Sequence, residues 1–155
     1  MRWQNGDRYD GEWEDGMRSG KGKYISKATG GVYEGEYQAD LKAGFGKYSF
    51  TNGDYYEGNW KNGLRHGKGI YVWKELKENA ESIEEIGRYE GDWEKGLKQG
   101  TGKFSYPNGD VFTGPYENGN RHGKGELVKI DGEVRTENYK EGKLVNFTVT
   151  KEKST

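Results

Sequence analysis

The feature that most constrains the fold is a short stretch that is repeated along the chain, and residues 56–73, YEGNWKNGLRHGKGIYVW, are its clearest copy. At the two-residue period of a strand, Tyr56, Gly58 and Trp60 lie on one face. The Asn-Gly pair that follows is a strong hairpin signal, because both central residues of the favoured turn have positive φ. A second extended segment comes after this turn. Each copy therefore predicts one β-hairpin.

The pattern recurs at a nearly fixed period along most of the chain. In each copy an opening aromatic residue is followed by a glycine two residues later and by a second aromatic residue four residues later. The opening residues are Tyr9, Tyr33, Tyr56, Tyr89 and Phe112. A period between about 20 and 50 residues is typical of solenoids and repeat arrays. We therefore predict an all-β fold, an elongated single-layer antiparallel solenoid of about six β-hairpins.

Composition alone would suggest disorder, because only 30% of the residues are hydrophobic and the mean hydropathy is -1.22. The 27 glycines and the aromatic residues are periodic, however. In a solenoid each hairpin stacks only on its neighbours, so aromatic rings that bridge successive strands can replace a large aliphatic core. The periodicity therefore favours a folded array.

These units resemble MORN repeats (membrane occupation and recognition nexus), whose usual form is YxGxWxxGxxxGxGxxxxxxGxx. The resemblance covers about residues 1–142, with a partial repeat at residues 1–8 and a degenerate repeat from Arg135, where Glu137 stands at the glycine position. Residues 143–155 are expected to form a capping strand and a frayed tail. The start within a repeat suggests either a naturally trimmed first unit or an array cut from a longer one, and we favour the second.

The third repeat is longer than the others. The gap to the next opening tyrosine is 33 residues, which places an insertion within residues 74–87. Leu76, Ala80 and Ile83 have helical spacing, so we predict a short amphipathic helical segment there. We favour a solvated loop that replaces the turn between repeats, with a docking element specific to this protein as the alternative.

Charge and residue usage exclude several functional classes. The 25 basic and 26 acidic residues balance, so no overall field attracts nucleic acid. There is no cysteine, and we predict no metal and no cofactor. His66 and His122 occupy one repeat position and should lie too far apart to share an ion. No long apolar run suggests a membrane span. We predict a cytoplasmic protein that is not an enzyme.

Aromatic residues supply the main candidates for partner binding. One row stands at the fourth residue after each opening aromatic, and another on the second strand of each hairpin. In a single-layer sheet such rows are partly exposed, and contiguous aromatic surface often marks a partner site. The glycines between the rows would leave a trough for a peptide or a helix. The candidates are Trp13, Tyr24, Tyr37, Tyr48, Trp60, Tyr71, Trp93, Phe104 and Tyr116.

Basic residues form a second regular set. One follows the first strand of every repeat, and further lysines come three residues later in some of them. We favour cross-strand pairing with the acidic side chains, at most about 1 kcal/mol for each exposed pair. The alternative is a basic rim that binds phosphoinositides or other acidic phospholipids. The lipid-binding candidates are Arg18, Lys42, Arg65, Lys68, Lys98, Arg121 and Lys124.

We therefore predict a non-enzymatic scaffold that holds an extended or helical segment of a protein partner along the aromatic trough. The resemblance implies association with cytoskeletal, ciliary or membrane-linked assemblies, with radial spoke head and other axonemal proteins as relatives. It also leaves open a regulatory segment of a larger enzyme, since MORN arrays occur beside lipid kinase and methyltransferase domains. A homodimer could form wherever the terminal strands are uncovered.

Overall fold

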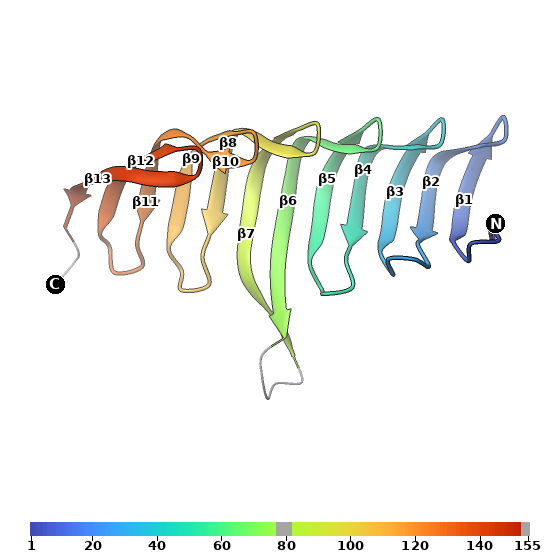
Figure 1. Cartoon of the computed structure of the whole chain (residues 1–155), viewed down its shortest axis with the longest axis horizontal. Helices are drawn as coiled ribbons and strands as arrows, with labels where there is room; N and C mark the ends of the chain where they lie inside the picture. Colours follow the sequence, from blue (N-terminus) through green and yellow to red (C-terminus); the bar gives the residue numbers. More distant parts are fainter. Residues whose placement is uncertain (77–81, 153–155) are drawn as a thin grey trace.

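A computed structural model describes residues 1–76 and 82–152, and this part of the chain forms one open antiparallel sheet of 13 strands without a helix (Figure 1). The strands are β1 (Arg8–Glu14), β2 (Met17–Ile25), β3 (Val32–Gln38), β4 (Leu41–Ser49), β5 (Tyr55–Lys61), β6 (Leu64–Leu76), β7 (Ile83–Glu94), β8 (Leu97–Ser105), β9 (Val111–Glu117), β10 (Asn120–Arg121), β11 (Gly123–Val128), β12 (Val134–Lys140) and β13 (Lys143–Lys151).

Neighbouring strands in the sheet are also neighbours in the sequence, apart from the short β10, which pairs with β9 beside β11. The chain therefore crosses the sheet once, from β1 at one end to β13 at the other, and none of the described residues forms a second layer on either face (Figure 1). The predicted all-β, single-layer solenoid of hairpins is confirmed.

Tight turns close the hairpins and fasten each one to the hairpin before it. Asn62 and Gly63 both have positive φ, 51° and 80°, as the favoured two-residue turn requires. The Gly63 amide then donates a 2.9 Å hydrogen bond to the carbonyl oxygen of Lys42 in the preceding repeat. The Gly96 amide bonds the carbonyl of Arg65 in the same way, at 2.9 Å. We call these bonds the turn latches.

The insertion in the third repeat lengthens a hairpin instead of forming a helix. β6 and β7 continue past their neighbours, and their ends project from one edge of the sheet (Figure 1). Leu76 and Ile83 lie opposite each other in the ladder of this hairpin. The predicted helical segment is therefore wrong for these two residues, because a seven-residue spacing also fits two strands that face each other. Ala80 lies outside the described residues.

The last hairpin lacks the repeat pattern but keeps its backbone. Strands β12 and β13 pair along their length and are joined by Glu141 and Gly142, with φ of 50° and 84°. Glu137 takes the glycine position opposite Gly125 and is buried, and its carboxylate accepts a 2.8 Å hydrogen bond from the Tyr139 hydroxyl. A polar pair thus replaces the packing of a ring on glycine at this end of the sheet.

The strand register gives the sheet two different faces. On one, which we call the aromatic face, direct cross-strand neighbours form an unbroken line of rings over nine strands, from β1 to β9. The line is Tyr9, Tyr24, Tyr33, Tyr48, Tyr56, Tyr71, Tyr89, Phe104 and Phe112. The opposite side carries the alternating charged residues, and we call it the charged face. The cluster of buried rings lies on the aromatic face, and the one fully buried side chain described on the charged face is Val72.

Candidate functional site

Glycines make room for the rings of the aromatic face. Gly58 and Gly69 lie opposite each other on β5 and β6, and a Cβ atom added at Gly69 would come within 2.2 Å of the Tyr56 hydroxyl oxygen. The ring of Tyr56 therefore lies against the backbone of this glycine pair. Its hydroxyl donates a 2.8 Å hydrogen bond to the carbonyl oxygen of Asn59. The arrangement leaves Tyr56 fully buried on a sheet that has no second layer.

The second aromatic residue of each repeat joins successive repeats. The Trp60 ring packs edge to face against Tyr56 of its own repeat at 5.1 Å and against Tyr33 of the preceding repeat at 5.3 Å, measured between ring centroids. Its Nε1 donates a 3.0 Å hydrogen bond to the Gly46 carbonyl. Edge-to-face pairs at this separation are favourable. Trp60 is therefore a core residue shared by two repeats.

This packing corrects one expectation about the aromatic trough. The row at the fourth position was expected to be partly exposed, and Trp13 at the end of the sheet is 41% exposed. The others are buried and offer little surface to a partner: Tyr37 (4%), Trp60 (9%), Trp93 (5%) and Tyr116 (4%). The expectation was wrong for these four because each ring is covered by an opening tyrosine or phenylalanine from two repeats.

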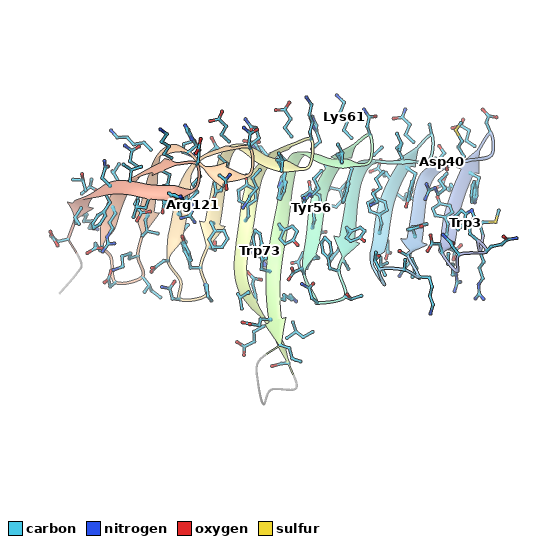
Figure 2. The ribbon with its side chains drawn as sticks, in the orientation of Figure 1. Trp3, Asp40, Tyr56, Lys61, Trp73 and Arg121 are labelled. Atoms are coloured by element: carbon cyan, nitrogen blue, oxygen red, sulfur yellow. The ribbon has the colours of Figure 1, made fainter. Side chains whose placement is uncertain are left out.

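The second row of rings remains accessible. Its members, Tyr24, Tyr48, Tyr71 and Phe104, are half-buried and pack against the core. Further rings extend the row toward the edge of the sheet from which the long hairpin projects (Figure 2). The Trp73 ring lies 5.7 Å from Phe104, and Phe50, 40% exposed, lies 4.7 Å from Tyr48. These rings form the accessible part of the aromatic face.

The first basic row lies within the aromatic face. A two-residue turn pairs Trp60 directly with Arg65, and direct cross-strand partners point to the same side of a sheet. The equivalent pairs are Trp13 with Arg18, Tyr37 with Lys42, Trp93 with Lys98, and Tyr116 with Arg121. Five cations therefore sit between the two aromatic rows, and Figure 2 shows Arg121 and Tyr56 within the body of the sheet. We call these five residues the cation row.

Each cation of this row is held over aromatic rings. The Lys42 Nζ lies 4.6 Å from the Tyr48 centroid and 4.9 Å from that of Trp60. The Lys98 Nζ lies 5.3 Å from the Trp73 centroid. Such separations allow attraction between the cation and the ring face. Burial nevertheless lowers the pKa of both lysines, because a charge in this setting loses hydration.

Only one member of the cation row pairs with a carboxylate in the described part of the chain. Arg18 Nε lies 3.1 Å from Asp40 Oδ1, and the hydrogen bonds that the Arg18 backbone N–H and guanidinium donate to this carboxylate hold the pKa of Asp40 below its usual value. Arg65 instead donates a 2.8 Å hydrogen bond to the Gly96 carbonyl, and Arg121 donates a 3.1 Å bond to the Tyr139 hydroxyl. The other four cations of the row therefore have no carboxylate partner among the residues that the structure describes.

The remaining lipid-binding candidates lie on the other side of the sheet. Lys68 lies on the charged face, where its Nζ is 2.6 Å from an Asp92 oxygen, and Lys124 holds the equivalent strand position. The seven basic candidates therefore do not form one rim. The sequence contained the signal for this division, since counting outward from the Asn-Gly turn pairs Trp60 with Arg65 and leaves Lys68 facing the opposite way.

The described residues contain no group of three or more histidine or acidic side chains that could hold a metal ion. In the same part of the chain there is no helix long and apolar enough to cross a membrane.

Comparison with known families agrees with this geometry. The sequence profile of the MORN repeat matches residues 9–27, 33–55, 56–75, 89–111 and 112–134, which together make up more than half of the chain. No curated protein is detectably similar to it in sequence. MORN repeats generally act as interaction modules for proteins or membrane lipids. The chain belongs to the MORN repeat family.

Proposed function

We propose that this protein is a non-enzymatic scaffold that holds an acidic segment of a partner protein on its aromatic face. One observation carries the proposal: the cation row lies between half-buried rings, and four of its members pair with no described carboxylate, namely Lys42, Arg65, Lys98 and Arg121. A surface that keeps partly dehydrated cations unpaired gains free energy when a partner supplies the anions.

The rings and the cations of this surface would contact different parts of a partner segment, its apolar and its acidic side chains. Tyr48, Tyr71 and Phe104 offer apolar contact area of the kind that anchors partner segments. The cation row repeats once in two strands, roughly 9 to 10 Å apart at the usual strand spacing. Acidic side chains three residues apart on a polyproline II segment, or seven apart on a helix, point to one side and have about the same spacing. An extended segment of this kind and a helix are therefore both compatible with the row.

The family context supports a place in a cytoskeletal, ciliary or membrane-linked assembly, as the resemblance to axonemal proteins implied. Membrane lipid is the second anionic partner that the cation row could meet. The placement of Lys68 and Lys124 on the charged face argues against one lipid-binding rim, because a flat bilayer reaches one side of the sheet at a time. A regulatory role beside an enzyme domain stays a prediction.

The test removes charge from each face in turn. Lys42→Met with Lys98→Met keeps the side-chain stems and removes two cations of the aromatic face. Lys68→Met with Lys124→Met is the matched control on the charged face. The probes are a fluorescent peptide with glutamate at every third position, and liposomes that contain phosphoinositide. We expect the first double variant to weaken peptide binding about tenfold or more and the control to change it little.

Circular dichroism and thermal melting must first show that both double variants are folded. Equal loss in the two variants, or no peptide binding by the unmodified protein, would count against an acidic protein segment on the aromatic face. Liposome binding at physiological salt that is lost in the first variant, without peptide binding, would make lipid the partner instead.

A further inference from the structure

The charged face carries a regular ladder that is broken at one position. Along direct cross-strand neighbours from β1 to β8, acidic and basic side chains alternate. The line reads Asp10, Lys23, Glu34, Lys47, Glu57, Ile70, Glu90 and Lys103. Ile70 stands where the alternation calls for a lysine, so two carboxylates face each other across an apolar side chain.

A second exception stands one repeat away. On the second strand of each hairpin, one glycine pairs with the glycine of the first strand. The residue before this glycine is Lys21, Phe45, Lys68, Thr101 or Lys124 in the five repeats. Phe45 again replaces a lysine with an apolar residue, and its side chain is 54% exposed. An exposed aromatic side chain at this place contributes nothing to the core, which lies on the aromatic face.

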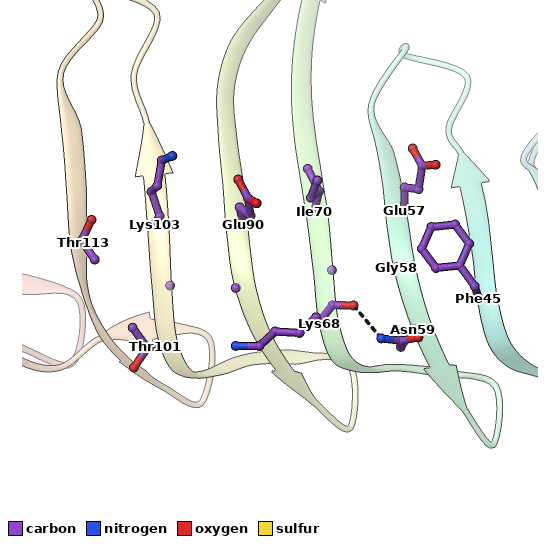
Figure 3. Close-up of a pocket in the computed structure, with 13 residues that line it drawn as sticks. Phe45, Glu57, Gly58, Asn59, Lys68, Ile70, Glu90, Thr101, Lys103 and Thr113 are labelled. Atoms are coloured by element: carbon purple, nitrogen blue, oxygen red, sulfur yellow. Dashed lines mark hydrogen bonds between the residues drawn. The ribbon is translucent and has the colours of Figure 1, made fainter.

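Both exceptions line the same groove on the charged face. The groove is open, has a volume of about 740 Å³ and extends from Phe45 past Ile70 to Thr113 (Figure 3). Glycine backbone contributes to its lining at residues 58, 69, 91 and 102. Figure 3 shows Glu57, Ile70 and Glu90 side by side on successive strands. The groove therefore joins an exposed ring, an aliphatic side chain and two carboxylates. It is also lined by Lys103 and by Lys68, whose charge is paired with Asp92.

The two carboxylates beside Ile70 have no salt bridge with a described residue, whereas Glu34 and Asp92 on the same face each have one. The Lys23 Nζ lies 3.3 Å from Glu34 Oε2, and the Lys68 Nζ lies 2.6 Å from Asp92 Oδ1. Glu57 and Glu90 are two strands apart, roughly 9 to 10 Å. A long basic side chain can lay its stem on Ile70 and place its charge between them.

We propose that this groove binds a segment of a partner protein that presents an apolar side chain next to a lysine or arginine. The basic side chain lies over Ile70 and supplies the cation that the ladder lacks. The apolar side chain packs against Phe45 and the glycine backbone. This site lies on the opposite side of the sheet from the aromatic face and selects the opposite charge, so one array can hold two different partners at once.

The repeats themselves supply the variants for a test. Ile70→Lys and Phe45→Lys restore the residue found at the same position in other repeats, so both should fold. Lys23→Ile is the matched control, because it places an isoleucine between Asp10 and Glu34 outside the groove. The probe is a capped hexapeptide of alternating leucine and lysine, added up to millimolar concentration to ¹⁵N-labelled protein.

We expect the leucine and lysine peptide to shift the amide signals of the four glycines that line the groove, and a peptide with glutamate in place of lysine to leave them unchanged. Ile70→Lys should weaken binding about tenfold or more, Phe45→Lys should weaken it less, and Lys23→Ile should leave it unchanged. No shifts, equal shifts with both peptides, or unaltered binding by Ile70→Lys would overturn the proposal. Concentration-dependent shifts at Phe45 without peptide would overturn it in favour of a second copy of the chain.

Discussion

The two faces of this sheet are built from the same strands but differ in the substitutions that they tolerate. On the aromatic face each ring touches residues of two repeats, as Trp60 does with Tyr33 and Tyr56. On the charged face side chains meet their cross-strand neighbours through solvated ion pairs such as Lys23 with Glu34. Packing therefore dictates the residues on one face, whereas the other is free to vary at little cost in stability.

Departures from the repeat consequently mean different things on the two faces. Glu137 breaks the glycine line of the aromatic face, and the Tyr139 hydroxyl compensates by donating a hydrogen bond to it. Ile70 breaks the charge ladder, and nothing in the described structure compensates for it. The departure at Glu137 is balanced by a hydrogen bond and preserves the fold. The departure at Ile70 has no such balance, and because the charged face tolerates substitutions, it indicates a binding site for a partner.

The largest expected contrast is the response to alkali. Burial raises the pKa of the tyrosines of the aromatic face, most strongly for four of them, so these stay protonated in the fold while the unfolded chain ionises near pH 10. They are Tyr33, Tyr37, Tyr56 and Tyr89. Stability is thus fully present below about pH 10 and should fall as the pH rises further, by on the order of 1 kcal/mol per tyrosine for each pH unit.

Urea unfolding across this range, with tyrosinate absorbance recorded, measures the effect. The lowered pKa values of Lys42 and Lys98 act in the opposite direction, because the folded state loses these charges first, and they offset part of the fall. Tyr56→Phe should make the dependence on pH less steep. A free energy of unfolding that stays constant above pH 10 would contradict the buried setting of these rings.

Next in size is the removal of one large ring from each face. Trp60→Ala should lower the free energy of unfolding by about 3 to 5 kcal/mol, because the indole fills a site shared by two repeats. Phe45→Ala should change it by less than about 1 kcal/mol, since that ring is largely exposed. Chemical denaturation of both variants measures the two losses, and similar values would contradict the placement of the ring cluster on the aromatic face.

A smaller effect is expected from adding one methyl group. A Cβ atom at Gly58 would lie 2.4 Å from the Gly69 Cα, a backbone atom that cannot move aside cheaply. Gly58→Ala should therefore cost about 2 to 3 kcal/mol. Asn59→Ala, one residue along on the charged face, loses a single 3.3 Å hydrogen bond to the Lys68 carbonyl and should cost under about 1 kcal/mol. Thermal melting compares the two, and the reverse order would refute the glycine packing.

The smallest effect belongs to the ion pairs of the charged face. Lys23→Met removes the partner of Glu34, and both side chains are largely exposed, at 50% and 68%. We expect a change within about 0.5 kcal/mol that shrinks as salt is added. Denaturation at low and high salt measures it, and a loss comparable to that of Gly58→Ala would erase the distinction between the faces.

Much of this fold could be predicted from the sequence, because its signals are local. The Asn-Gly turn at residues 62–63 and the alternation of Tyr56, Gly58 and Trp60 define a hairpin without reference to the rest of the chain. The wrong prediction of a helical segment in the insertion also came from a local pattern. Leu76 and Ile83 have a spacing that suits a helix, yet the ladder of the neighbouring hairpin simply continues through them.

The candidate sites depended on contacts between repeats, which a local pattern does not contain. The burial of Trp60 requires Tyr33 from the preceding repeat, so its exposure could not be judged from its own hairpin. Phe45 and Ile70 are far apart in the sequence and share a groove because only β5 separates their strands. The side of the sheet on which Arg65 lies, in contrast, follows from the turn length and could have been predicted.

The turn latches also determine how the protein would bear mechanical load. Each latch and each strand ladder joins a hairpin only to its neighbour, and the ends of the chain lie at opposite ends of the sheet (Figure 1). Tension applied through the two ends acts along the direction of the hydrogen bonds between strands. The hydrogen bonds then break one pair after another, starting from a terminal strand. Anchored at both ends, the array would lengthen in steps of one hairpin and recover each step when the load falls.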